Sequence, residues 1–104
     1  HITAIFQPHL YSRTRDFYRD FAESLSLMDE VILVDIYPAR EQPIPGVSSQ
    51  LIYDHLRPGI AKSLVQKADV PDLVRRSQFD VLITLGAGDL DNLADQIAAI
   101  VAQK

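Results

Sequence analysis

The fold of this chain is decided by a junction near its start, where residues 2–16 read ITAIFQPHLYSRTRD. Residues 2–5 form an apolar run typical of a buried strand, and Phe17, Phe21 and Leu25 then recur at the spacing of a helix face. A histidine, a tyrosine and two arginines therefore lie where a strand passes into a helix. Because ligands of open α/β sheets bind outside the carboxyl ends of the strands, these side chains favour an anionic ligand over a role in packing.

Strand and helix patterns alternate along the rest of the chain. We expect strands at 2–7, 30–36, 63–66 and 79–85, and helices at 13–26, from 48 or 49 to 56, from 69 or 70 to 76, and after 89. This alternation predicts one α/β domain, residues 1–104, with a Rossmann-like parallel sheet, right-handed crossovers and helices on both faces. The last helix is expected to be capped by Asp89, with an apolar stripe of Leu90, Leu93, Ala94, Ile97 and Val101.

The composition excludes several classes of protein. The chain has 104 residues, a net charge of −4 and no cysteine. An acidic balance argues against non-specific nucleic-acid binding, which needs a basic face. Without cysteine there are no disulfides or thiolate metal sites, and no apolar run approaches the ~20 residues that span a bilayer. We expect a cytoplasmic protein with no nucleic-acid or membrane partner. Since a strand begins directly after His1, we interpret the chain as a piece of a longer protein.

Parallel topology has a geometric consequence for three loops. The loops at 7–12, 37–47 and 86–88 each follow a strand, so they should converge at one edge of the sheet. The opposite edge carries only short connectors at 57–59 and 77–78. The residues that the converging loops bring together are His9, Tyr11, Arg13, Tyr37, Arg40, Glu41 and the turn Gly86-Ala87-Gly88.

Within the first loop, His9 and Arg13 are the strongest candidates for binding a ligand. Pro8 stiffens the backbone before His9, so the imidazole is aimed rather than mobile. Arg13 lies nearer the strand end than Arg15, which has Asp16 beside it as a surface partner. A helix N-terminus here would add N–H donors for an anion. The alternative is a helix-entry histidine that bonds only to backbone.

The loops after the second and last strands give weaker signals. Asp35, at a strand end, is a candidate to orient His9 or Arg13, and Arg40 and Glu41 read as an exposed ion pair of little energetic value. Gly86 and Gly88 begin a phosphate-binding pattern that is incomplete, because Asp91 stands where its third glycine belongs. No metal-ligand spacing, P-loop or G-x-S-x-G motif is present. The chain therefore reads as one part of a composite site, with no catalytic residue of its own.

Three segments carry a resemblance to a known family. Residues 6–21, 35–44 and 84–89 read FQPHLYSRTRDFYRDF, DIYPAREQPI and TLGAGD, in this order. They resemble the C-terminal domain of the Mur ligases, in particular the branch that joins L-alanine to UDP-N-acetylmuramate. The family's stretch before the first strand is absent here, and Leu10 stands where many relatives have arginine.

The resemblance implies an ATP- and Mg²⁺-dependent ligase of three domains, in which a central domain binds most of the ATP and metal. By the same resemblance, His9 and Arg13 would lie near the amino acid and its carboxylate. From the converging loops we also expect Tyr11 and Tyr37 to bind substrate and Gly86 and Gly88 to bind the nucleotide cofactor. The domain would pack on its own central domain during closure. Alone it would not catalyse.

Three alternatives stay open. A murein peptide ligase shares the sugar nucleotide, but residues 7–9, Gln-Pro-His, favour the alanine branch. A stand-alone receiver-like module needs an acidic pair after its first strand, which this chain lacks. An interaction domain would use its proline-containing loop, 37–47, to dock a partner without any small ligand.

Overall fold

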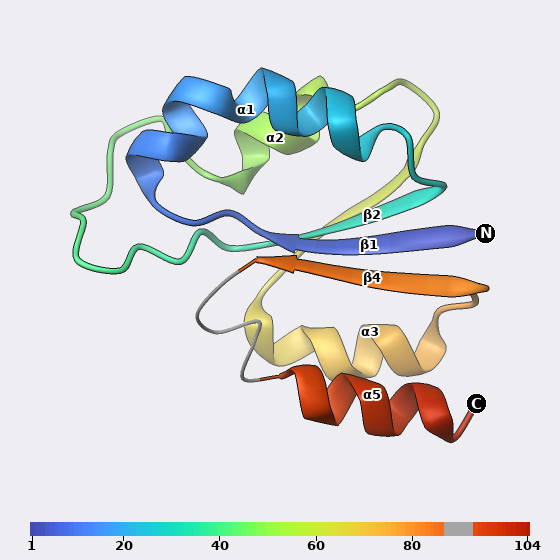
Figure 1. The fold of residues 1–104 in the computed structure, drawn as a ribbon. Coiled ribbons are helices and arrows are strands. Elements are labelled where there is room, and N and C mark those ends of the chain that lie inside the picture. Colours follow the sequence, from blue (N-terminus) through green and yellow to red (C-terminus); the bar gives the residue numbers. More distant parts are fainter. Residues whose placement is uncertain (87–92) are drawn as a thin grey trace.

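Four parallel strands form the centre of the molecule, a computed structural model that describes residues 1–86 and 93–104 (Figure 1). Their order in the sheet is β3-β2-β1-β4. The strands are β1 (Ile2–Gln7), β2 (Glu30–Val34), β3 (Ala61–Val65) and β4 (Val81–Gly86).

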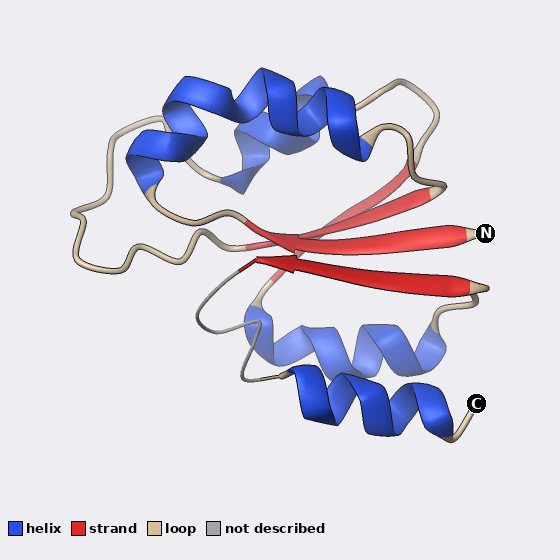
Figure 2. Ribbon diagram, in the orientation of Figure 1, coloured by secondary structure: helices blue, strands red, loops and turns tan. Residues whose placement is uncertain are grey.

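Helices cover both faces of this sheet, which confirms the expected three-layer α/β fold (Figure 2). The helices α1 (Tyr11–Leu25) and α2 (Ser49–His55) lie on one face, above the strands in Figure 1. On the other face lie α3 (Val70–Arg76), which a short 3₁₀ helix at Lys67–Asp69 precedes, and α5 (Ala94–Ala102). None of the described helices is long and apolar enough to cross a membrane.

The central strands β1 and β2 explain the apolar runs of the sequence. Side chains of a strand point alternately to opposite faces, and both faces are covered here, so nearly every position is buried. One core, beneath α1 and α2, consists of Ala4, Ala22, Leu25, Val31, Leu33, Ile52, Leu56 and Ile60. The other, beneath α3 and α5, consists of Ile5, Ile32, Val34, Val70, Val74, Ile97 and Ile100.

The strand order reverses between β1 and β4. From β1 the chain moves to β2 and then β3 on one side, and β4 returns to the other side of β1. The helix after β1 lies on one face of the sheet, and α5, the next described helix after β4, lies on the other (Figure 1). A crevice at such a switch point is where open α/β sheets bind ligands.

Several strand ends differ from the prediction because pairing decides them. β2 ends at Val34 rather than at residue 36, since Val34 pairs with Val65 at the end of β3. The third strand begins at Ala61, not 63, because Ala61 pairs with Glu30 at the start of β2. The fourth runs from Val81 to Gly86, in register with β1, rather than from 79 to 85.

The last helix shows a partly wrong prediction. Leu93 is half-buried and Ile97 and Ile100 are buried, whereas Ala94 and Val101 are exposed. Because α5 packs beside α3 as well as on the sheet, its inward face is centred on positions 93, 97 and 100. The expected cap Asp89 and the stripe residue Leu90 lie outside the described residues.

Candidate functional site

The loops after β1 and β2 are joined by backbone hydrogen bonds. The Leu10 N–H donates to the Tyr37 carbonyl at 2.9 Å, and the Tyr37 N–H donates to the Pro8 carbonyl at 2.8 Å. These bonds form an isolated parallel bridge between His9 and Tyr37. The Gln7 side-chain amide also donates to the Asp35 carbonyl at 3.1 Å. Two of the three loops expected to converge therefore form one structural unit.

His9 and Tyr37 also contact each other through their rings. The ring centroids lie 5.8 Å apart, with the planes inclined by 17°. His9 is exposed and Tyr37 is half-buried, so the tyrosine supports one face of the imidazole and leaves the rest of that ring accessible. The structure therefore holds His9 in one orientation at the strand-end edge.

Arg13 lies in the first turn of α1, where it is exposed. Within residues 1–86 and 93–104 its guanidinium makes no hydrogen bond or ion pair. Arg15, in contrast, donates to the Asp16 carboxylate at 3.0 Å, and this hydrogen bond raises the pKa of Arg15. Of these two arginines, Arg13 is thus the one available to a ligand. Tyr11, half-buried, begins the same helix.

Glu41 has a different environment from the one expected. Instead of forming an exposed pair with Arg40, its carboxylate accepts the Ser12 N–H at 3.1 Å and the Ser12 hydroxyl at 2.5 Å. The hydroxyl hydrogen bond is the main reason that the pKa of Glu41 lies below its ordinary value of 4.5. No local pattern in the sequence indicates this contact, because 29 residues separate the partners.

Gly86 lies at the end of β4, directly beside Gln7 of β1. Its φ is +146°, and a Cβ at this position would lie 2.8 Å from the Gln7 carbonyl oxygen. The close approach of the two strands therefore explains this glycine, because a larger residue would collide with the backbone of Gln7. The nucleotide contact of Gly86 stays a prediction, and that of Gly88 falls outside the described residues.

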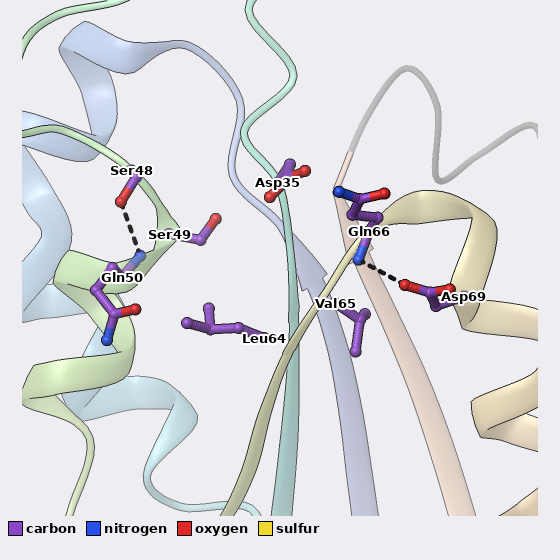
Figure 3. Close-up of a pocket in the computed structure, with 8 residues that line it drawn as sticks. All are labelled: Asp35, Ser48, Ser49, Gln50, Leu64, Val65, Gln66 and Asp69. Carbon is purple, nitrogen blue, oxygen red and sulfur yellow. Dashed lines mark hydrogen bonds between the residues drawn. The ribbon is translucent and has the colours of Figure 1, made fainter.

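A pocket of about 360 Å³ lies at the same edge of the sheet, between the ends of β2 and β3 and the start of α2 (Figure 3). The described residues that line it are Asp35, Ser48, Ser49, Gln50, Leu64, Val65, Gln66 and Asp69. The sequence indicated Ser48 and Ser49 only as caps, so the pocket was missed.

The carboxylates of Asp35 and Asp69 line this pocket, and both residues are exposed. Negative charge here disfavours phosphate or carboxylate ligands. In the described part of the chain, no hydrogen bond or ion pair joins the Asp35 side chain to His9 or Arg13, so the expected orienting contact is not found. An anionic ligand is better matched to the edge that carries His9 and Arg13.

A metal site is not found in the part of the chain that the structure describes. No group of three or more His, Cys, Asp or Glu side chains there could hold a metal ion.

No protein-family model matches this chain. Curated relatives match it over most of its length. It is 67% identical over 103 residues to the UDP-N-acetylmuramate–L-alanine ligase of Phocaeicola vulgatus, a match that covers 99% of this chain and 22% of the relative. Ligases of the same name from Parabacteroides distasonis and Porphyromonas gingivalis are 50% identical over 103 residues and 60% identical over 94 residues.

These matches cover 99% and 89% of this chain, and 22% and 20% of the two relatives. The chain thus spans about a fifth of the length of the curated relatives that it matches. Identity this high over nearly the whole chain confirms the resemblance seen in its motifs, and the chain belongs to the Mur ligase family.

Proposed function

We propose that residues 1–104 are the C-terminal domain of an ATP-dependent ligase that joins L-alanine to the lactyl carboxylate of UDP-N-acetylmuramate. The identity to three ligases of that name, up to 67%, supports the proposal. The chain carries neither a P-loop nor a metal-ligand cluster in its described residues, so ATP and Mg²⁺ are held mainly by another domain of the cytoplasmic enzyme.

In this proposal, the domain supplies the binding edge for the incoming amino acid. The observation that carries it is the exposed guanidinium of Arg13, unpaired within the described residues, on the helix that directly follows His9, whose imidazole stacks on Tyr37. Arginine grips a carboxylate with two parallel hydrogen bonds, and the imidazole adds a further polar contact. Tyr11 and Tyr37 flank these groups. Gly86 and Gly88 face the nucleotide when the domain closes over the central domain.

Steady-state kinetics of the full-length ligase test this assignment. We expect Arg13→Ala and His9→Ala to raise the KM for L-alanine by roughly tenfold or more, since a hydrogen bond to a charged group contributes about 1.5–3 kcal/mol. The KM for ATP should change by less than about twofold. Arg19→Ala is the matched control, because Arg19 lies later on α1 and contacts Tyr18.

An unchanged KM for L-alanine in both variants would show that this edge binds no amino acid and would favour a docking surface. A second test uses the 104-residue chain by itself. We expect it to show no ATP-dependent ligation of L-alanine, and measurable turnover would overturn the composite site.

A further inference from the structure

The start of α1 lacks a cap from its own segment. Leu10 occupies the N-cap position with φ +70°, and no side chain of that segment caps the helix. The first turn also contains no acidic residue. A helix start without such groups leaves N–H donors unsatisfied.

Glu41, from the loop after β2, supplies the missing cap. Its two carboxylate oxygens accept the N–H and the hydroxyl of Ser12. A carboxylate is also the charge that the helix dipole favours at this end. The N-terminus of α1 is therefore already occupied by an internal anion, which corrects the expectation that its N–H groups bind the ligand.

The cap closes a ring between the two loops. One connection is the backbone bridge between His9 and Tyr37, and the other is the bond between Ser12 and Glu41. Each loop has one non-glycine residue with positive φ between these connections, Leu10 at +70° and Ala39 at +53°. Such conformations are costly and persist only where neighbouring contacts enforce them.

We propose that Glu41 is a positioning residue for the amino-acid site: by closing this ring it fixes His9 and Arg13 at the edge of the sheet. His9 lies within the ring, and Arg13 directly follows the capped residue Ser12. Because Glu41 fills the helix N-terminus, the carboxylate of the ligand is directed to the Arg13 guanidinium instead. The inference rests on the proposed function.

The test combines kinetics and NMR of the full-length ligase. Glu41→Ala should raise the KM for L-alanine roughly fivefold, the effect expected of a lost cap, and should change kcat and the KM for ATP by less than about twofold. Glu41→Gln should recover most of the loss, because its amide oxygen still accepts the Ser12 N–H. The double variant Ser12→Ala/Glu41→Ala should have the same KM for L-alanine as Glu41→Ala alone, because the two side chains act as a pair.

The ring resonance of His9, assigned by comparison with His9→Ala, gives a readout that needs no substrate. It should move in Glu41→Ala, because the position of the imidazole over Tyr37 changes. It should stay in place in the control Glu23→Ala, which removes an exposed glutamate of α1 that makes no contact with the loop after β2 in the described residues.

Two results would overturn the positioning role. One is an unmoved His9 resonance in Glu41→Ala, even where Arg13→Ala raises the KM for L-alanine. The other is a lower Tm together with a fall in kcat and a similar rise in the KM values for L-alanine and ATP. That pattern indicates a residue with a merely structural role. If instead His9→Ala and Arg13→Ala leave the KM for L-alanine unchanged, the proposed function itself fails.

Discussion

The imidazole of His9 lies nearly parallel to the phenol ring of Tyr37, and the backbones of the two residues form a parallel bridge. The pair joins the end of β1 to the loop after β2. It places a polar ring just beyond the carboxyl end of β1, one of the two strands between which the strand order reverses. This relationship links the topology of the sheet to the proposed binding of an amino acid.

Removing the supporting ring should weaken this arrangement. We expect Tyr37→Ala to raise the KM for L-alanine several-fold in the full-length ligase, and to destabilise the chain by about 1 kcal/mol, the typical value of an aromatic pair. Tyr37→Phe keeps the ring and should behave nearly as the wild type. Kinetics and urea unfolding check both variants, and equal effects of Ala and Phe would exclude a role for the stacked ring.

The substitution Gly86→Ala tests the close contact between β4 and β1. In Gly86→Ala, the new Cβ meets the Gln7 carbonyl at 2.8 Å, and the φ of +146° is unfavourable for alanine. We expect a loss of about 1–3 kcal/mol in the free energy of unfolding, measured with urea.

Gly46→Ala is the matched control for this substitution. Gly46 also has positive φ, +80°, but nothing lies within 4 Å of its added Cβ. Gly46→Ala should lower the free energy of unfolding only through its unfavourable backbone conformation, by about 1 kcal/mol. Equal losses in the two variants would argue that the contact with Gln7 is unimportant.

The contact between Glu41 and Ser12 predicts a pH-dependent stability. Folding lowers the pKa of Glu41 below its ordinary 4.5, mainly through the Ser12 hydroxyl hydrogen bond, so folding favours the charged carboxylate. The stabilisation is therefore complete above pH 4.5 and is lost as the pH falls through the folded-state pKa.

Urea unfolding of the wild type and of Glu41→Gln at several pH values measures this difference. The stability advantage of the wild type should be constant from pH 7 to about pH 5 and should shrink below pH 4.5. Glu23→Gln controls for the removal of a surface carboxylate. If the difference in the free energy of unfolding between wild type and Glu41→Gln grows toward acid pH, the stabilising contact of the Glu41 carboxylate with Ser12 is contradicted.

From the exposed outer edge of β4 we predict that the isolated 104-residue chain self-associates. Val81 and Leu85 of this edge strand are 48% and 39% exposed, and a groove of about 410 Å³ beside it is lined mainly by apolar residues that include Leu82 and Ile97. Exposed apolar edge strands pair with other chains, and a lysine at such an edge opposes pairing.

Sedimentation of the 104-residue chain at increasing concentration should therefore show oligomers that Val81→Lys reduces. Leu27→Lys is the control, because Leu27 is 83% exposed in the turn after α1, away from β4. A wild-type chain that stays monomeric at every concentration would rule out this role of the edge.

The elements that local pattern decides were predicted well. The apolar run of β2 and the proline in the first turn of α3 each follow from neighbouring residues, and both elements lie where they were expected. Strand ends were predicted less well, because a strand stops where its partner stops. The inward face of α5 was shifted, because the position of α3 beside it decides which side chains are buried.

By itself, the sequence determined the order of strands and helices, the parallel sheet, the edge at which the loops meet and the family of the chain. The spacing of apolar side chains and the presence of motifs are local properties of the chain, so they can be read without coordinates. Only the tertiary structure decided that Glu41 caps α1, that Tyr37 supports His9 and that Gln7 fills the space beside Gly86. Each of these contacts joins residues 28 or more positions apart, and such partners meet only when the sheet has formed.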